Sequence, residues 1–386
     1  MSINETLRAQ LRANKRPVEQ ASVLPAHCYK SPDWYQDEIE KIFMQEWLCV
    51  GRESQIARKG DYFTIEIGKE PLVVTRDHKG VTRAFLNVCR HRASKIVEGS
   101  GNAPTFVCKY HCWTYNLDGD LIVVPGKPNP MIGAEDFDRK LYGLIPLRIE
   151  SWGGFLFVTF SEELPRLMQW LGDLPAFLEN YRLHEMVVDY ELSFDLDVNW
   201  KVFVENTMES YHAGFLHHKF LSPDIDQAWK FLRTGGPYEA MYSDKSIMNF
   251  GNLPPAACLN EQQKAGLYHV WLHPNTTIHV TSTYMTYRRY IPRGVDKMTI
   301  MYAWCFLPET KAHPDFEGIA KDYYKRSVAI LSEDIEFIPK VQEGLSSSRW
   351  RPGRYSPTES IVHKLGNYVT ERVAGEELAA DPVGQR

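Results

Sequence analysis

The segments VCRHRA (residues 88–93) and VCKYHCWTY (residues 107–115) each carry one cysteine and one histidine that can bind a metal. One residue separates the pair in the first segment, and two residues separate the pair in the second. A Rieske-type [2Fe–2S] cluster uses this mixed set, because two thiolates bind one iron and two imidazoles bind the other. The candidate cluster ligands are Cys89, His91, Cys108 and His111.

A four-ligand structural zinc site is the main alternative, since it also uses cysteine and histidine. Such sites usually pair like ligands, at C-x2–4-C and H-x3–5-H spacing. Here each segment carries one ligand of each kind, so the spacing favours the cluster. Neutral imidazoles also raise the reduction potential, so the predicted centre would accept electrons from a low-potential donor.

The composition is that of a globular protein of about two or three domains, with 386 residues of which 44% are hydrophobic. The formal net charge of -5 gives no reason to expect nucleic-acid binding. The 7 cysteines are too scattered for a secreted disulfide framework, the first residues do not resemble a signal peptide, and no apolar run approaches the ~18 residues of a membrane span. We therefore expect a cytoplasmic protein without a membrane anchor.

The pattern along the chain predicts three parts: an N-terminal segment and helix (1–45), a cluster domain (46–160) and a second domain (161–386). Residues 1–22 are polar and are expected to be mobile or peripheral. The tripeptide SPD at 31–33 predicts a helix start, with serine as the N-cap and proline at the first helical position. Short alternating segments separated by Gly, Asp and Asn then predict strands through the cluster domain.

The second domain mixes helical and strand patterns. Helical patterns lie at 166–182 and 200–213, and a long helix is predicted over 315–345. Residues 187–197 and the segments within 269–307 have the alternation of antiparallel strands. Strand runs flanked by separate helical blocks indicate an α+β layer structure.

A second group of candidate ligands lies in NWKVFVENTMESYHAGFLHHKF (199–220). Glu209 and His212 are three residues apart, so a helix would place them on one face. His212 and His217 would point about 140° apart on an ideal helix. They can converge on one metal only if the helix ends or bulges between them, and Gly214 is the position where that is expected.

Two histidines and one carboxylate form the facial triad of non-haem Fe(II) oxygenases, which leaves open positions for O2 and substrate. The carboxylate must come from a distant element. Asp334 on the predicted late helix is the first candidate, and Glu333 and Glu336 are rivals on the same turn. Acidic residues on a helix more often form a solvated face, so the choice stays open at this point.

These motifs resemble those of the large (α) subunit of Rieske non-haem iron oxygenases, over about residues 30–350. The resemblance implies an α+β protein: an N-terminal all-β Rieske [2Fe–2S] domain and a C-terminal helix-grip-type catalytic domain with a central antiparallel sheet. It also implies that the cysteines of the two loops hold one cluster iron and that the histidines hold the other.

The resemblance further assigns the mononuclear iron to His212, His217 and Asp334. It implies that Glu209 bridges a cluster histidine of one subunit to an iron-ligand histidine of the next, in a head-to-tail homotrimer. His218 is left as a supporting or structural residue, because the family spacing selects His217.

Four positions depart from the common family pattern. Ring-hydroxylating members usually have Asp at the bridge, where this chain has Glu209, and Glu is found in members that oxidise quaternary amines such as carnitine. Ala93 and Cys112 stand where Gly is common, and Lys109 where Pro is common. Cys112 is expected to be a small buried residue next to the cluster.

The leading functional expectation is a terminal oxygenase that uses O2 to hydroxylate a small aromatic substrate. One alternative is monooxygenation or N-demethylation of a quaternary or tertiary amine, carnitine-like or betaine-like. The other is a non-catalytic Rieske electron-transfer protein, although the first ligand loop lacks the second cysteine that such proteins use for a disulfide.

The sequence GSGNAP (99–104) does not fit the dinucleotide-binding pattern G-x-G-x-x-G. A separate flavin or iron–sulfur reductase is therefore expected to carry electrons from NADH, and a small β subunit is an open possibility. Candidate pocket residues are Tyr211, Phe215, Tyr284, Tyr287, Tyr290 and Trp304. Arg288 and Arg289 are available to hold a substrate carboxylate.

Overall fold

The computed structural model describes residues 3–126, 128, 131, 134–232, 234–243 and 253–379, and structural statements refer to these residues. The chain forms two compact units. The β unit comprises Glu46–Gln169, and the α+β unit comprises Met1–Gln45 together with Trp170–Arg386. Within the described residues, no helix combines the length and the apolar character needed to cross a membrane.

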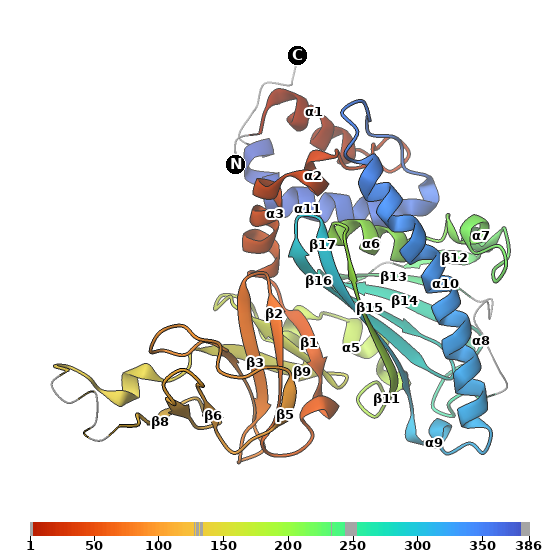
Figure 1. Cartoon of the computed structure of the whole chain (residues 1–386). Helices are drawn as coiled ribbons and strands as arrows, with labels where there is room; N and C mark the ends of the chain where they lie inside the picture. Colours follow the sequence, from red (N-terminus) through yellow and green to blue (C-terminus); the bar gives the residue numbers. More distant parts are fainter. Residues whose placement is uncertain are drawn as a thin grey trace. The chain divides into compact units, whose positions relative to one another are not determined.

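The β unit is built from antiparallel strands joined by long loops and two short 3-10 helices (Figure 1). Its larger sheet has the order β1-β10-β9-β4-β3-β2-β5. These strands are β1 (Leu48–Arg52), β2 (Asp61–Ile67), β3 (Glu70–Arg76), β4 (Thr82–Leu86), β5 (Ser100–Asn102), β9 (Pro146–Trp152) and β10 (Phe155–Thr159). The smaller sheet contains β6 (Phe106–Val107), β7 (Thr114–Tyr115) and β8 (Leu121–Val123). The predicted all-β character is confirmed.

One hydrophobic core of the β unit includes the sulfur-bearing ends of both predicted ligand loops. Cys89 and Cys108 are buried in the same cluster as Phe85, Phe106 and Tyr115. The two loops are therefore anchored on one packed core, although they lie in different parts of the sequence.

The α+β unit is built on a seven-stranded antiparallel sheet with the order β11-β17-β16-β15-β14-β13-β12. Its strands are β11 (Val187–Leu196), β12 (Trp229–Leu232), β13 (Tyr238–Ser243), β14 (Leu267–Leu272), β15 (Thr276–Val280), β16 (Met285–Gly294) and β17 (Lys297–Phe306). The predicted central antiparallel sheet is confirmed. The edge strand β12 and its neighbour β13 were not predicted from the sequence.

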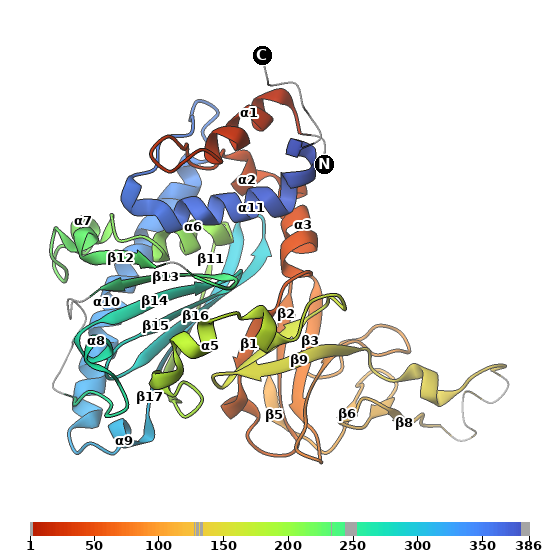
Figure 2. The same ribbon diagram turned by 180° about the vertical axis from the view of Figure 1, so that it is seen from behind.

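Helices pack on this sheet. The long helix α10 (Phe316–Gly344) lies in front of the sheet in Figure 1 and behind it in Figure 2, and it contacts α6 (Trp200–Thr207). Shorter helices of this unit are α5 (Leu174–Phe177), α7 (Ala213–Leu216), α8 (Glu261–Ala265) and α9 (Pro308–Lys311). The short helix α4 (Leu167–Trp170) spans the point in the sequence where the two units divide. The predicted long helix is confirmed, whereas α11 (Ser360–Ala379) was not predicted.

The N-terminal segment contains α1 (Glu5–Asn14), α2 (His27–Lys30) and α3 (Pro32–Glu38). The predicted start of α3 is confirmed, because the Ser31 hydroxyl accepts the Trp34 N–H at 3.3 Å. The expectation that residues 1–22 are mobile or peripheral is wrong for α1. This helix buries Leu7 and Leu11, which are four residues apart on one face, and it packs against α11.

A buried ion pair ties α3 to α6. Glu38 Oε1 lies 2.6 Å from Lys201 Nζ, and neither side chain is exposed. The same carboxylate accepts the indole N–H of Trp34 (2.9 Å) and that of Trp200 (2.8 Å). Because each of its oxygens is hydrogen-bonded, the buried charge of Glu38 is compensated.

Candidate metal centres and active site

The first predicted cluster loop is a tight turn closed by two backbone hydrogen bonds. The N–H of Cys89 donates to the carbonyl of Ser94 at 2.9 Å, and the N–H of Ala93 donates to the carbonyl of Cys89 at 3.0 Å. These bonds fix the loop so that the cysteine points into the core while His91, halfway round, is exposed.

The second loop repeats this arrangement. The N–H of Cys108 donates to the carbonyl of Trp113 at 2.9 Å, and the N–H of Cys112 donates to the carbonyl of Cys108 at 2.8 Å. The two loops thus have the same backbone bonds at the same offsets from their cysteines.

The closing residue of each turn lies in the left-handed region, with φ of 57° at Ala93 and 56° at Cys112. Glycine adopts this conformation most readily, which explains why the family commonly has Gly at both positions. Cys112 is exposed. The prediction that it is a buried residue beside the cluster is therefore wrong, because the left-handed backbone turns its side chain toward solvent.

The predicted cluster ligands face one another across the two loops. The rings of His91 and His111 have centroids 4.6 Å apart, and His91 also stacks on Trp113 at 4.8 Å. The hydroxyl of Tyr115 lies 3.4 Å from the Cys89 sulfur. Two buried sulfurs and two more accessible imidazoles on facing loops fit a [2Fe–2S] cluster whose histidine-bound iron lies toward the surface.

The second group of ligands depends on where α6 ends. The helix stops at Thr207, so the predicted helix over 200–213 is wrong at its C-terminal end. After Thr207, Glu209 Oε2 accepts the backbone N–H of His212 at 3.0 Å. The chain turns at this hydrogen bond. The one-turn helix α7 follows, with His212 at its beginning and His217 at its end.

Gly214 is not the point at which the chain breaks, because it lies inside α7. Glycine is needed here because the backbone of Pro223 passes close by: a Cβ at this position would lie 2.5 Å from the carbonyl oxygen of Pro223. The expected interruption between His212 and His217 is therefore not found, and the break lies before His212, where α6 ends at Thr207.

This break lets three predicted ligands converge. One ligand atom each from His212, His217 and Asp334 lies within 4.8 Å of the others. Asp334 Oδ1 is 3.1 Å from His217 Nε2 and 3.5 Å from His212 Nε2. His212 and His217 lie at the two ends of α7, and Asp334 lies on α10. The packing of these two helices therefore fixes the geometry of the site.

The outer nitrogen of each imidazole contacts a glutamate. Glu209 accepts from Nδ1 of His212, and Glu333 accepts from Nδ1 of His217 at 2.8 Å. This fixes the tautomers and directs both Nε2 atoms toward Asp334, an arrangement typical of histidines that bind metals. Asn206 also donates its amide to Asp334 at 3.1 Å. From the sequence, Glu333 was considered only as a rival ligand, and Asn206 was noted in the same segment without a role.

The rival carboxylates lie elsewhere. Glu333 contacts His217 from the outer side, and the side chain of Glu336 is 79% exposed and pairs with Lys340 at 3.4 Å. His218 is exposed, and its Nδ1 lies 3.0 Å from the carbonyl of Phe215. Among the three candidates on α10, only Asp334 is directed at both histidines.

The electrostatics of the site suit a divalent cation. Burial alone lowers the pKa of His212, but Asp334 and Glu209 outweigh it and raise the pKa to about 10. The pKa of Asp334 is lowered, because the two histidines overcome the effect of its burial. Several carboxylates around two imidazoles therefore stabilise positive charge, and a metal ion can replace the protons.

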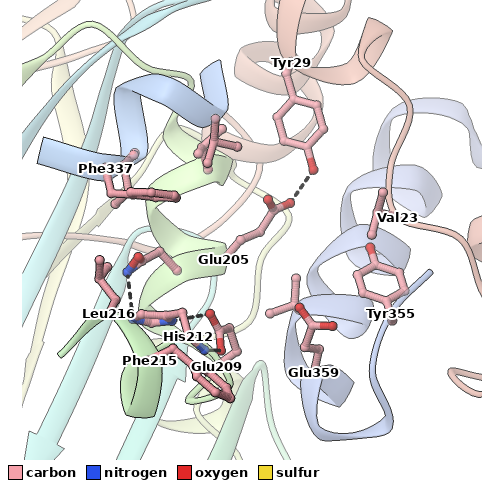
Figure 3. Close-up of a pocket in the computed structure, with 15 residues that line it drawn as sticks. Val23, Tyr29, Glu205, Glu209, His212, Phe215, Leu216, Phe337, Tyr355 and Glu359 are labelled. Carbon is pink, nitrogen blue, oxygen red and sulfur yellow. Dashed lines mark hydrogen bonds and ion pairs between the residues drawn. The ribbon is translucent and has the colours of Figure 1, made fainter. Parts of the chain in front are cut away.

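Two cavities meet at this group of residues. The larger one, about 520 Å³, is lined by Glu205, Glu209, His212 and Phe215, and Figure 3 shows Tyr29 and Glu359 at its other sides. The smaller one, about 110 Å³, lies between Asp334 and the sheet.

The predicted pocket aromatics are mostly placed elsewhere. Of the six, only Phe215 lines either cavity, and Tyr211 and Phe215 are 48% and 68% exposed. Arg288 lines the smaller cavity, whereas Arg289 points to the opposite face of β16 because successive strand residues alternate.

Family comparison supports both units. Residues 183–375 match the ring hydroxylating α subunit (catalytic domain), and residues 46–142 match the Rieske [2Fe–2S] domain. The chain is 31% identical over 369 residues to a chloroplastic choline monooxygenase of Arabidopsis thaliana, covering 90% of this chain and 82% of that protein. It is 30% identical over 370 residues to a carnitine monooxygenase oxygenase subunit of Acinetobacter baumannii, covering 91% and 92%.

Solved structures of this family have the same fold as this chain. A quaternary ammonium Rieske monooxygenase, described for carnitine oxidation by gut microbiota and inter-subunit electron transfer, has a TM-score of 0.79 and 25% identity, covering 96% of this chain and 99% of that one. Naphthalene 1,2-dioxygenase from Rhodococcus sp. has a TM-score of 0.77 at 22% identity, covering 96% and 99%, and shows the common fold alone.

These matches span both units and agree with the two groups of ligands described above. The expected cofactors are thereby confirmed as one Rieske [2Fe–2S] cluster and one mononuclear iron. The expected aromatic substrate is not confirmed. The chain belongs to the family of ring-hydroxylating α subunits of Rieske oxygenases, enzymes that use iron and O2.

Proposed function

We propose that this chain is the oxygenase component of a monooxygenase system acting on a small quaternary ammonium compound. The observation that carries the proposal is its similarity, along nearly the whole chain, to a choline monooxygenase and a carnitine monooxygenase oxygenase subunit. Glu209 agrees with it, since the bridging position carries Glu in members that oxidise quaternary amines. This was the alternative to the aromatic substrate.

The three converging residues have distinct roles in this proposal. His212 and His217 would hold the mononuclear iron with their Nε2 atoms and Asp334 with a carboxylate oxygen, since these atoms face one another. Glu209 and Glu333 hold the Nδ1 protons of the two histidines and so fix the ring orientations. When bound, the iron and the cluster supply the O2-activating and electron-transfer chemistry. The cluster is held by Cys89, His91, Cys108 and His111.

Electrons are proposed to come from a separate reductase that oxidises NADH, and to pass between subunits of a homotrimer. The position of Glu209 beside His212 in the lining of the larger cavity supports this role for its carboxylate. Exposed apolar side chains gather around that cavity, namely Phe215, Phe337 and Val341. Such a patch is suited to a protein partner.

The test is O2-coupled turnover by the iron-loaded protein with a surrogate reductase and NADH. Carnitine, glycine betaine, choline and benzoate are offered in parallel, and O2 uptake is compared with substrate loss and product mass. We expect oxidation of at least one quaternary ammonium compound in proportion to O2. Oxidation of benzoate with none of the three onium compounds consumed would overturn the proposal and restore the aromatic substrate.

A further inference from the structure

The wall of the smaller cavity that faces the metal ligands is a row of polar side chains on the sheet. His269 on β14 pairs directly with His279 on β15, and His279 pairs with Thr286 on β16. Directly paired residues share one face of a sheet, and Arg288, two residues after Thr286, shares it too. His269, His279 and Arg288 all line the cavity.

Several polar atoms of this row have no hydrogen-bond partner among the described residues. They include Nε2 of His269, Nε2 of His279, Oγ1 of Thr286 and Nε of Arg288. The two histidines are each only 8% exposed. Buried polar groups are nearly always satisfied, so this row calls for a ligand or water in the cavity.

The charge of Arg288 has no carboxylate partner within ion-pair distance in the described part of the chain. Its guanidinium stacks on the ring of Tyr302, with 4.4 Å between the guanidinium carbon and the ring centroid. The Tyr290 hydroxyl hydrogen-bonds to this guanidinium and Asp334 acts on its charge from a distance, while Nε of Arg288 has no partner among the described residues. Arg288 is half-buried with its Nε fully enclosed, so leaving this donor unpaired is costly, and a carboxylate is the best planar partner of a guanidinium.

The histidines add donors rather than charge. Burial lowers the pKa of His269, and it lowers that of His279 to about 3, with the charge of Arg288 acting in the same direction. Both rings are therefore neutral at neutral pH, and each offers one N–H. The indole nitrogen of Trp229, also at this cavity and also without a partner in the described chain, can only donate.

The opposite wall belongs to the metal site, with Asn206, His212 and Asp334. A molecule in the cavity would therefore have one end on the donors of the sheet and the other at the metal ligands. The volume of about 110 Å³ is small beside the roughly 300–1,000 Å³ common for ligand sites, which favours a compact substrate.

Resting on the proposed function, we propose that the substrate carries a carboxylate, which Arg288 binds with help from His269 and His279. The preferred substrate is then a trimethylammonio acid, such as glycine betaine or carnitine, rather than the alcohol choline. The carboxylate lies at the sheet, and a methyl group on nitrogen lies toward the metal ligands.

The test is equilibrium binding to the iron-loaded protein without O2 or reductant, by calorimetry, with glycine betaine, carnitine, choline and benzoate. We expect the better of the two betaines to bind at least about 10-fold more tightly than choline, since choline lacks the charged carboxylate that accepts these hydrogen bonds. Arg288→Gln should weaken betaine binding about 10–100-fold and change choline binding less than about 3-fold. Arg288→Lys should recover part of the loss.

Arg293→Gln is the matched control, because Arg293 is an exposed arginine on the same strand and lies outside the cavity. It should bind as the wild type does. If Arg288→Gln does not fold, the proposal is tested by the binding of the same ligands to His279→Gln and by the preference of the wild type for betaines over choline. Choline binding as tightly as both betaines, or an equal loss for all ligands in Arg288→Gln, would overturn the carboxylate inference. Binding of benzoate alone, lost in Arg288→Gln, would instead overturn the quaternary ammonium proposal and leave the carboxylate site standing.

Discussion

Ala93 and Cys112 show how single residues shape the cluster loops. Both close an equivalent turn with a positive φ, although neither is glycine. A side chain in the left-handed region costs about 1–2 kcal/mol relative to its ordinary conformations. The loops hold these residues there because the hydrogen bonds that close the turns leave no other backbone path.

Cys112→Gly should therefore raise the free energy of unfolding by about 1 kcal/mol, after the greater flexibility of glycine in the unfolded chain is counted. The measurement is unfolding followed by loss of the cluster absorbance. Cys112→Ala is the control, since it removes the thiol but keeps Cβ, and it should give no gain. Equal stability of the two variants would show that the backbone at this position is not strained.

Glu209 is the residue on which the proposed electron path depends. Glu209→Gln keeps an acceptor for the Nδ1 proton of His212 but removes the charge. We expect the cluster and the mononuclear iron to be retained while multiple-turnover activity falls at least about 10-fold. Metal analysis and O2-coupled product formation check this. Normal turnover would remove the bridge assignment.

Helical periodicity could not choose among the neighbouring acidic residues of α10, and only the family resemblance pointed to Asp334. Asp334, Glu333 and Glu336 lie on one helix, and periodicity alone does not say which is directed at the histidines. Their roles depend on how α10 lies against α7, because Glu333 meets His217 from outside and Asp334 meets it from inside. The two ligand motifs were recognisable because their spacing is local.

At the scale of elements, the end of α6 determines the metal site. The apolar pattern continues past Thr207, so a helix through residue 213 was the natural prediction. The chain turns instead where Glu209 takes up the His212 N–H. Such competition between a side chain and the helix backbone leaves little trace in hydrophobic periodicity.

Helix α6 also carries a half-buried acid, Glu205, which accepts the phenol O–H of Tyr29 at 2.5 Å. Burial raises its pKa to about 7, although the bond from Tyr29 acts in the opposite direction. In the unfolded chain the carboxyl titrates near 4.5. As pH rises from 4.5 to 7, the unfolded state loses this proton first, so Glu205 reduces stability by up to about 3 kcal/mol.

Glu205→Gln should remove this dependence. The variant should gain stability relative to the wild type as pH rises from about 4.5 to about 7, and the difference should then stay constant. Denaturant unfolding at a series of pH values measures it. A difference between the two proteins that is the same at every pH would contradict the raised pKa.

At the scale of the whole molecule, residues Met1–Gln45 belong to the same compact unit as the catalytic sheet. Nothing in the local sequence pattern indicates this association, because it depends on contacts such as Glu38–Lys201 between distant positions. The same is true of the donor row: His269, His279 and Arg288 come from three strands and meet only when the sheet forms. Strand periodicity predicted the strands but not which residues would be paired.

Breaking the Glu38–Lys201 pair should be strongly destabilising. Lys201→Met leaves a buried carboxylate without its partner and should cost about 3–5 kcal/mol of unfolding free energy. The double variant Glu38→Gln with Lys201→Met should regain at least half of that loss, because no uncompensated charge remains. Denaturant unfolding of the two single variants and of the double variant gives the coupling free energy between Glu38 and Lys201. Additive losses would mean that the two side chains do not act as a pair.

The most direct test of the account is the iron and acid-labile sulfide content of the purified, reconstituted protein and of its Asp334→Ala variant. The account predicts about three irons per chain in the wild type, two in the cluster and one at His212, His217 and Asp334. Asp334→Ala should lose about one iron and no sulfide, whereas Glu336→Ala, on the exposed side of α10, should lose neither. An Asp334→Ala protein with unchanged iron would contradict the assignment of the mononuclear site.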